Sequence, residues 1–582
     1  MSTAVSVKFE VQIPLRDGVN LSAILYLPSE HAQPTPTIVT LTPYTAQLFH
    51  DRGMYFASHG YPFLAVDVRG RGNSDGEFRP MIQEARDGYD VIEWTAAQHY
   101  CNGQVAMWGG SYGGYAQWAT AKERPPHLAT IVPAAAAYPG VDFPMWNNVW
   151  SPYAIQWLTL VSGKTLQDRL FWGSERFWRE RFRGWFVSHD SFRSIGATLG
   201  THLSSAFNEW LNHPHPDSYW DRFNPTRSDY AKLTLPTLTI TGIYDADQPG
   251  ALKHFQEYLA HSSPQTREHQ YLIVGPWDHA GTRAPQLKFC GIEVEPQAVI
   301  DVGRLHLEWY AWIMRQGPKP AFLKRNVAYY LMAAERWCYA DSLESITAAY
   351  DYLYLDSPGS ASHTFASGSL GGLPGSGDPD EYIYDPSDVY AAESEAASLD
   401  PVSLRPPFPQ DNVRDDSQNF VREGKQLYYH SAPFEHDTEI SGFFELSVWL
   451  AIDQPDTDFR VTVFEVLVDG TSIMLATDSM RARFREDLRE PRLIQTTQPL
   501  KYEFNRFTFV SRLVRAGSHL RLVFGPIDSI FFEKNHNSGG VVSDETGSDA
   551  RAVRVRLFHD GTRPSALYVP LGNGGVEDHG FS

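Results

Sequence analysis

The sequence predicts an α/β fold, a mostly parallel sheet covered by helices, that carries a helical insertion and is followed by an all-β sandwich. In the first 350 residues, short apolar runs alternate with longer segments of helical periodicity, as expected for a sheet built from strand–helix units. One stretch lacks this alternation and holds eight of the sixteen tryptophans. Beyond residue 350, short alternating segments follow one another between turns, which is typical of a sandwich. Because 582 residues are too many for one hydrophobic core, we expect several structural units.

The chain begins with a predicted β-hairpin over residues 5–28. Its two alternating segments flank Arg16-Asp17-Gly18-Val19-Asn20, and Asp-Gly is a turn signal because it tolerates positive φ. Continuous apolar runs, typical of parallel strands covered on both faces, then predict five buried strands: Thr37–Thr42, Phe63–Asp67, Val105–Trp108, Thr237–Thr241 and Tyr271–Val274. We therefore expect one α/β domain formed by residues 1–140 and 231–350.

Residues 141–230 are predicted to form a helical cap domain, inserted between the third and fourth of these strands. Its aromatic side chains include Trp146, Trp150, Trp157 and Phe171. Aromatic groups line many ligand pockets, yet they also fill the contacts between helices, which is the expected role of most of these four. Trp146 and Trp150 are the predicted contacts with a substrate.

Residues 351–582 are predicted to form a β-sandwich of the jelly-roll type. The segment Ser357–Asp380 is rich in Gly, Ser and Pro and is interpreted as a boundary region and surface loop. Downstream, strands are predicted where apolar and polar residues alternate: Gly442–Leu450, Asp458–Val468, Tyr502–Phe509 and His519–Phe524.

Composition limits the classes of partner. The formal net charge is −20, so we expect no broad basic face for phosphates, and neither nucleic acid nor an anionic membrane as a partner. The opening residues lack the apolar run of a secretory signal, and no stretch approaches the ~18 apolar residues of a membrane span. We therefore expect a cytoplasmic protein. Cys101, Cys290 and Cys338 form no Cys-x-x-Cys pair and are interpreted as reduced, buried thiols.

The most informative motif is Gly109-x-Ser111-x-Gly113, which directly follows the strand Val105–Trp108 and opens a helical pattern. A strand, this motif and a helix together make a nucleophile elbow, the sharp turn on which an α/β-hydrolase exposes its reactive serine. Side chains at positions 109 and 113 are expected to clash with the neighbouring strand and helix. Ser111 is therefore the predicted nucleophile.

A serine hydroxyl needs a base to take its proton, and in this fold the base follows the acid in the chain. Among 21 histidines, His279 stands out because it directly follows the strand Tyr271–Val274. Asp245 follows the preceding strand through a short turn and is predicted to orient the imidazole. Asp247 and Asp278 are the competing acids.

Two further histidines, His213 and His215, lie in Asn-His-Pro-His-Pro. Because no third ligand sits at a telling spacing, they are interpreted as solvated loop residues and not as metal ligands. Neither a metal nor a cofactor is predicted.

Attack on a carbonyl creates an oxyanion that requires two preorganised hydrogen-bond donors. The backbone N–H of Tyr112, the residue after the nucleophile, is the first predicted donor. The second is expected from the loop after Thr37–Thr42, where Tyr44 offers a phenol in place of the glycine-rich backbone common in lipases. From its position alone, Tyr44 could equally be a packing residue.

Several segments together resemble the cocaine esterase-like (CocE/NonD) hydrolases, which share an architecture with X-Pro dipeptidyl-peptidases and α-amino-acid ester hydrolases. They span nearly the whole chain: Pro43-Tyr44, Asp67–Phe78, Gly109–Gly113, Tyr244-Asp245, Gly275–His279, Asp456–Phe459 and Asn535–Gly540. The resemblance implies an α/β-hydrolase core, a helical cap and a jelly-roll domain that helps to wall the active site. It also implies that Tyr44 is the second oxyanion donor and that the charged residues of Arg69–Phe78 buttress the core.

The resemblance also bears on the substrate. Amino-ester hydrolases hold the substrate ammonium with a carboxylate cluster, and the two positions after the triad acid that contribute to it are Asp247 and Gln248 here. The cap offers Asn147 and Asn148 where further acid is expected. We therefore expect a small-molecule carboxylic ester as substrate, with Asp247 able to hold one ammonium or hydroxyl.

The alternative is an X-Pro dipeptidyl-peptidase or an α-amino-acid ester or amide hydrolase. It is placed second because X-Pro dipeptidyl-peptidases generally carry an additional N-terminal helical domain, whereas this sequence enters the core almost at once. An acyltransferase, a non-catalytic binding protein and a homo-oligomer also remain open.

Overall fold

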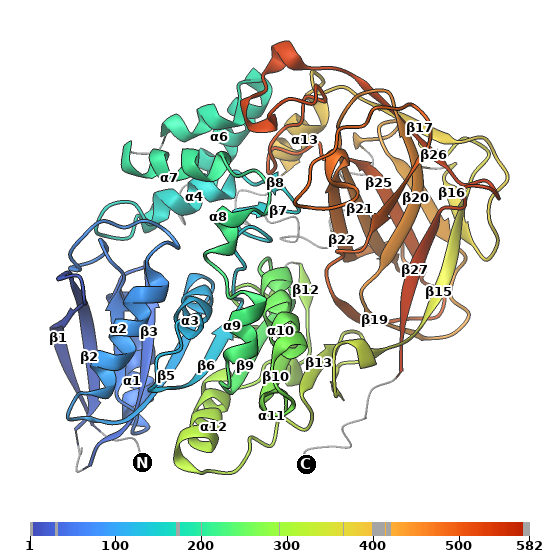
Figure 1. Ribbon diagram of the computed structural model, residues 1–582. Helices are drawn as coiled ribbons and strands as arrows, with labels where there is room; N and C mark the ends of the chain where they lie inside the picture. Colours follow the sequence, from blue (N-terminus) through green and yellow to red (C-terminus); the bar gives the residue numbers. More distant parts are fainter. Residues whose placement is uncertain are drawn as a thin grey trace.

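The α/β domain of the computed structural model is built on one large sheet (Figure 1). The structure describes residues 4–29, 33–169, 175–198, 201–289, 291–364, 366–398, 414 and 421–573. Within these residues the sheet has ten strands, in the order β1-β2-β4-β3-β5-β6-β9-β10-β13-β14. Their bounds are β1 (Val5–Pro14), β2 (Asn20–Pro28), β3 (Thr35–Thr42), β4 (Phe63–Asp67), β5 (Cys101–Gly110), β6 (Leu128–Ala134), β9 (Thr237–Tyr244), β10 (Gln270–Asp278), β13 (Val327–Leu331) and β14 (Arg336–Ala340).

The strands from β4 to β13 in this order are parallel, and the antiparallel pairs lie at the two edges of the sheet. The predicted hairpin is β1 and β2, and all five predicted strands are present. The predicted fold class is thereby confirmed. The sequence reasoning missed β6, β13 and β14. The insertion therefore follows β6, one strand later than expected.

Helices cover both faces of this sheet, which explains the uninterrupted apolar strands. Neighbouring residues of β3 point to opposite sides, since Ile38 packs in the core that contains Phe56 and Tyr310, whereas Val39 packs in the core that contains Trp118. The helices of the α/β domain are η1 (Ala46–Phe49), α1 (His50–Ser58), α2 (Glu84–Ala96), α3 (Tyr112–Lys122), α9 (Arg227–Lys232), α10 (Gln248–His261), α11 (Pro264–Arg267), η3 (Pro296–Ala298) and α12 (Val302–Arg315). A short hairpin, β11 (Lys288–Phe289) and β12 (Ile292–Glu293), precedes η3.

The insertion is mostly helical, as predicted, and Figure 1 shows α4, α6 and α7 grouped above the α/β domain and to the left of the sandwich. It opens with a small hairpin that was not predicted. Its elements are β7 (Met145–Trp146), β8 (Val149–Trp150), α4 (Tyr153–Leu160), α6 (Glu175–Ser188), η2 (Phe192–Thr198), α7 (Thr201–Leu211) and α8 (Ser218–Asp221). Phe171 lies outside the described residues.

The C-terminal part forms a second large sheet of thirteen strands among the described residues. Its strands are β15 (Thr347–Asp356), β16 (Gly368–Gly371), β17 (Asp380–Tyr384), β18 (Leu427–Ser431), β19 (Thr438–Gly442), β20 (Glu445–Ile452), β21 (Asp458–Val466), β22 (Ser472–Arg481), β23 (Leu500–Phe504), β24 (Val510–Val514), β25 (His519–Pro526), β26 (Val553–Phe558) and β27 (Ala566–Gly572). The remaining elements are η4 (Glu344–Ile346), α13 (Tyr390–Ser398), η5 (Ala482–Phe484), η6 (Val542–Asp544) and η7 (Gly547–Asp549).

Two details of this region differ from the expectation. The first strand begins at Thr347, a few residues before the predicted boundary. The segment Ser357–Asp380 is not only a surface loop, because β16 pairs within the sheet and Ala361 and Leu370 are buried in the core. Because Gly, Ser and Pro surround these two apolar residues, the sequence shows no strand pattern for β16.

The cap–sandwich junction is a cluster of buried polar groups made by Trp150, Asp458, Arg481, Glu533 and Lys534. Arg481 donates from Nε to Asp458 at 2.8 Å and from a terminal nitrogen to Glu533 at 2.8 Å. Glu533 also exchanges two hydrogen bonds with the backbone of Trp150, at 2.8 Å and 3.2 Å. The junction therefore ties the hairpin that opens the cap to the sandwich.

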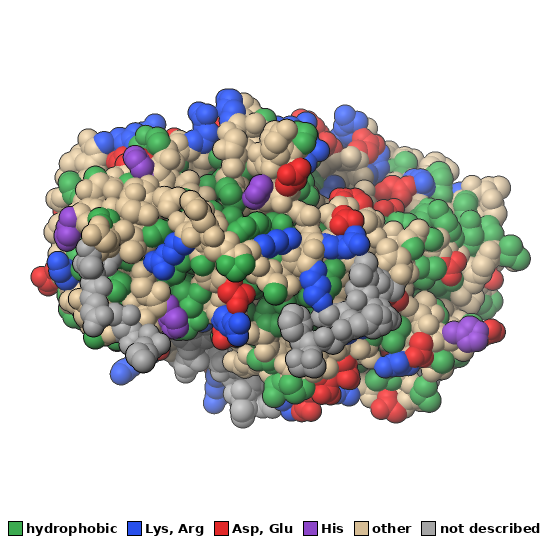
Figure 2. Space-filling view, turned by 90° about the horizontal axis from the view of Figure 1, so that it is seen from below, with side chains coloured by type: hydrophobic (Ala, Val, Ile, Leu, Met, Phe, Trp, Pro, Cys, Tyr) green, Lys and Arg blue, Asp and Glu red, His purple; other side chains and the backbone are tan. Residues whose placement is uncertain are grey.

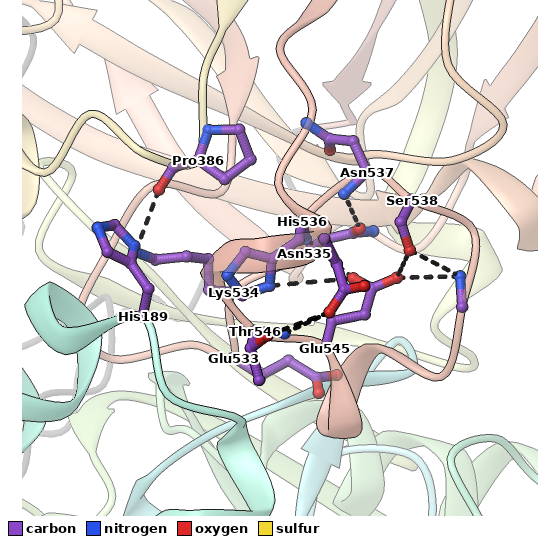
Figure 3. Close-up of polar contacts among 12 residues, drawn as sticks. His189, Pro386, Glu533, Lys534, Asn535, His536, Asn537, Ser538, Glu545 and Thr546 are labelled. Carbon is purple, nitrogen blue, oxygen red and sulfur yellow. Dashed lines mark hydrogen bonds and ion pairs between the residues drawn. The ribbon is translucent and has the colours of Figure 1, made fainter.

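Lys534 extends this junction to the end of α6. Its ammonium donates to the carbonyl of Phe186 at 2.7 Å, to Nδ1 of His189 at 2.9 Å and to the carbonyl of Pro386 at 3.2 Å. Figure 3 shows His189 and Pro386 at the tip of the Lys534 side chain. A cation at the C-terminal end of a helix interacts favourably with the helix dipole.

The molecular surface carries charges of both signs. On the face in Figure 2, basic and acidic side chains are interspersed and do not gather by sign. In the described part of the chain, no helix combines the length and the apolar character that a membrane crossing requires. Cys101 and Cys338 are buried, and Cys290 lies outside the described residues.

Candidate active site

Ser111 occupies the turn between β5 and α3 and has φ 59° and ψ −124°. A non-glycine residue in such a conformation costs roughly 1–3 kcal/mol and persists only where its surroundings hold it. Here the Ser111 N–H donates to the Ala134 carbonyl at 2.9 Å, and the Ser111 carbonyl accepts from the N–H of Gly114 at 2.8 Å. The end of β6 and the first turn of α3 thus fix the strained residue.

The glycines around Ser111 have different roles. A Cβ on Gly109, whose φ is +149°, would lie 3.2 Å from Oγ1 of Thr40 and 3.3 Å from the backbone of Gly113, which is tight. The expectation of a clash at Gly113 is wrong, since a Cβ there meets its nearest neighbour at 3.8 Å. The close approach falls on Gly114, where a Cβ would lie 2.8 Å from the carbonyl oxygen of Ala134.

His279 and Asp245 meet at the carboxyl ends of β10 and β9. Nδ1 of His279 lies 2.8 Å from Oδ1 of Asp245, and 3.8 Å from the nearer carboxyl oxygen of Asp247. Asp245 is fully buried and accepts further hydrogen bonds from Thr241 Oγ1 at 2.8 Å and from the Asp247 N–H at 3.0 Å. Asp278 accepts instead from the N–H of Gly281 at 2.7 Å. Among the three acids, the geometry favours Asp245 as the partner of the imidazole.

The electrostatics of His279 suit a base. Burial alone would lower the pKa of its imidazole, but the carboxylates of Asp247 and Asp245 outweigh burial and raise that pKa above its ordinary value. With Nδ1 donating to Asp245, Nε2 is the nitrogen left to accept a proton. His279 and Ser111 line the same pocket.

The two predicted oxyanion donors lie beside Ser111. The Tyr44 phenol accepts from Nε1 of Trp157 at 3.1 Å and lines the same pocket as Ser111. Burial raises the pKa of this phenol, although the hydrogen bond from Trp157 opposes the effect. It therefore stays protonated at neutral pH and keeps an O–H to donate. Tyr112 follows Ser111 and opens α3, and its backbone N–H stays the other predicted donor.

The Tyr112 side chain holds a neighbouring segment. Its phenol donates to the buried carboxyl of Glu84 and accepts from the Met81 N–H at 3.0 Å. The Tyr115 phenol donates to the Met81 carbonyl at 2.7 Å. Burial raises the pKa of Glu84 to about 7.

The pocket at Ser111 is small, with a cavity volume of about 20 Å³. Its lining combines aromatic side chains with the polar groups described above: Tyr44, Met81, Ser111, Tyr112, Ala137, Phe143, Tyr153, Trp157, Asp247 and His279. Of the predicted contacts, Asp247 lies in this lining, but Trp146 and Trp150 do not. Trp150 is fully buried against Trp220, at the junction with the sandwich. The cap tryptophan that reaches the pocket is Trp157, whose ring stacks on Tyr112 at 5.6 Å.

Sequence reasoning missed Asp142, a second carboxylate beside Asp247. Its carboxyl accepts from the backbone N–H groups of Tyr138 and Gly250, at 2.8 Å and 2.6 Å. Loss of surrounding water raises the pKa of Asp142 and of Asp247, and each has a further acid as neighbour. Nothing in the sequence distinguishes Asp142 from other loop acids.

The two cap asparagines, Asn147 and Asn148, contact the sandwich and are not among the residues that line the pocket. Asn147 donates to Asp478 at 2.9 Å and Asn148 to the carbonyl of Leu488 at 2.7 Å, so both contact the sandwich. His213 pairs with Asp217 at 2.6 Å and His215 packs against Phe484. Among the residues that the structure describes, no group of three His, Cys, Asp or Glu side chains could hold a metal ion.

Family comparisons match both halves of the chain. Residues 17–281 match the X-Pro dipeptidyl-peptidase (S15 family) and residues 323–567 match the X-Pro dipeptidyl-peptidase C-terminal non-catalytic domain. The cocaine esterase of Rhodococcus sp. (strain MB1 Bresler) is 24% identical over 596 residues, covering 97% of this chain and 98% of the esterase.

Solved structures share the whole architecture. An aminopeptidase from the marine sediment archaeon Thaumarchaeota archaeon superposes with a TM-score of 0.82 at 20% identity, covering 98% of this chain and 97% of that one. An α-amino acid ester hydrolase gives a TM-score of 0.81 at 19% identity with the same coverage. At these identities the structural likeness concerns the fold.

Proposed function

We propose that this chain cleaves carboxylic esters through an acyl-enzyme on Ser111. The chain belongs to the cocaine esterase-like (CocE/NonD) family of serine hydrolases, and it combines both X-Pro dipeptidyl-peptidase family domains. The observation that carries the proposal is the strained Ser111 in one pocket with His279, whose Nδ1 lies 2.8 Å from the buried Asp245. A nucleophile, a base and an acid that orients the base are the minimum for this chemistry.

In the first step, Nε2 of His279 takes the hydroxyl proton as Oγ of Ser111 attacks the ester carbonyl. The Tyr44 phenol and the Tyr112 N–H donate to the oxyanion of the tetrahedral intermediate. His279 then gives its proton to the departing alkoxide, which leaves an acyl group on Ser111. Water, deprotonated by His279, attacks this ester, and collapse of the second intermediate releases the acid and restores the Ser111 hydroxyl.

The lining of the pocket supports an ester of modest size. Phe143, Tyr153 and Trp157 supply an apolar wall, and the small cavity beside Ser111 favours a short acyl group.

An amino-acid ester or N-terminal peptide substrate is the second candidate. Asp247 lines the pocket and Asp142 lies close enough to influence its pKa, so an ammonium at this point would relieve the repulsion between the two carboxylates. Phenylglycine methyl ester and Ala-Pro-p-nitroanilide, each compared with its N-acetylated form, separate the candidates. Loss of rate on acetylation would favour the second.

The direct test uses p-nitrophenyl acetate and butyrate with the wild-type protein and Ser111→Ala. We expect the wild type to turn over both esters and to be labelled by a fluorophosphonate, and the variant to lose about 10⁶-fold in kcat and all labelling. Equal hydrolysis by the two proteins, or labelling of the variant, would contradict the proposal.

A further inference from the structure

Met81 is a buried pocket residue in an unfavourable backbone conformation. Its φ is 69°, its exposed fraction is 3%, and it lines the pocket together with Ser111. A long side chain at positive φ costs about 1–3 kcal/mol and persists only where several contacts enforce it. Such strain is often found where a residue has to be held in one place for function.

Two phenols from the nucleophile helix enforce this conformation. Tyr112 accepts from the Met81 N–H at 3.0 Å, and Tyr115 donates to the Met81 carbonyl at 2.7 Å. Both rings are buried, and Tyr112 is held in turn by its hydrogen bond to Glu84. Because Tyr112 directly follows Ser111, the Met81 backbone is fixed relative to the nucleophile through one residue.

The topology of the sheet puts Met81 and His279 on opposite sides of Ser111. Met81 lies in the segment between β4 and α2, and β4 and β3 lie on one side of β5 in the sheet. His279 follows β10, which lies on the other side of β5, beyond β6 and β9. The leaving group must point toward the imidazole that protonates it, so the Met81 side is left for the acyl group.

We propose that Met81 is the residue that sets how long an acyl chain the pocket accepts, an inference that rests on the proposed function of Ser111. The side chain ends the acyl half of the pocket, and the two phenols keep it from moving aside. Long acyl chains are therefore excluded, because the Met81 backbone is held in place and cannot move away from them.

The experiment measures kcat/KM for two series of esters: p-nitrophenyl acetate, butyrate, hexanoate and octanoate, and acetates of alcohols of increasing size. Met81→Ala removes three side-chain atoms, and Met81→Gly also relieves the positive φ, so at least one variant is expected to fold. One methylene in an apolar pocket is worth 10-fold or more in kcat/KM. We expect the hexanoate-to-acetate ratio to rise at least ~10-fold in both variants, with the alcohol series unchanged within ~2-fold.

Met314→Ala is the matched control, because Met314 is a comparably buried methionine on α12, away from the pocket. It should leave both series as in the wild type. An unchanged acyl ratio in a folded Met81 variant, or a shift confined to the alcohol series, would overturn the assignment. If the wild type hydrolyses no ester at all, the proposed function of Ser111 fails before Met81 is tested.

Discussion

The pocket at Ser111 and the cap–sandwich junction both hold carboxylates away from water, but the groups that surround these carboxylates differ. At the junction, Arg481 pairs with Asp458 and Glu533, and its pKa is raised because these two acids outweigh the effect of burial. At the pocket, Asp247 lines the wall and has Asp142 and Asp245 as neighbouring acids, and the imidazole of His279 is the group that Asp245 and Asp247 face.

This difference separates a structural region from a functional one. Buried ion pairs with complete hydrogen bonds fix how domains sit together, whereas carboxylates crowded around a titratable imidazole are typical of sites that act on a ligand. Substitutions in the pocket should therefore change rates with little change in stability, and substitutions at the junction should do the reverse.

Among variants that keep Ser111, the largest effect is expected for Asp245→Asn. The amide cannot hold the imidazole in the tautomer that leaves Nε2 free, so kcat on p-nitrophenyl butyrate should fall about 10⁴-fold. The urea midpoint should change little. Asp278→Asn is the matched control, since Asp278 accepts from Gly281 and not from His279, and its kcat should stay within about 10-fold of the wild type. Similar losses in the two variants would contradict the role of Asp245.

At the junction, Arg481→Met should lower the free energy of unfolding by about 3–5 kcal/mol, because Asp458 and Glu533 would remain buried without a cation. Arg492→Met removes an exposed pair with Glu486 and should cost less than about 1 kcal/mol. Urea unfolding measures both. An Arg481 variant as stable as the Arg492 variant would show that the junction does not depend on its ion pairs.

Tyr44→Phe tests a donor in the pocket. Without the phenolic O–H, kcat should fall about 10²–10³-fold while KM changes little, because the donor acts on the oxyanion that forms only during reaction. Michaelis parameters on p-nitrophenyl butyrate measure the two effects. A raised KM with kcat intact would make Tyr44 a packing residue.

The smallest effect concerns pH. The reaction needs neutral His279, whose pKa is raised by Asp247 and Asp245, so kcat/KM should increase as pH rises through a value above 6.5. Asp247→Asn removes one of these carboxylates and should move the acid limb to lower pH. A pH–rate profile of both proteins measures the shift. Movement to higher pH would contradict this account.

The placement of Ser111, Asp245 and His279 at the ends of strands could be predicted from sequence, whereas the walls of the pocket could not. Ser111, Asp245 and His279 each come shortly after an apolar run, and the residues that succeed parallel strands are delivered to one edge of the sheet. Trp157 and Met81 reach the pocket through contacts made far along the chain, with Tyr44 and with Tyr112. No local pattern distinguishes such residues from ordinary core.

The same reasoning explains the errors in the fold and in the cap. The run of β6 is interrupted by Pro133, and a proline weakens any strand signal. Trp150 and Trp157 have equal aromatic character, and only the docking of Glu533 shows that Trp150 belongs to the junction. Gly113 and Gly114 are adjacent, and only the position of Ala134 shows which of them has no room for a side chain.

The pairing of Trp150 with Glu533 has a consequence for how the protein is made. These partners are separated by 383 residues, so at about 5–20 residues per second a ribosome needs roughly 20–80 s to supply the second after the first. During that time the Trp150 backbone lacks its partner Glu533. The contact between the cap and the sandwich is therefore completed only after nearly the whole chain has been synthesised.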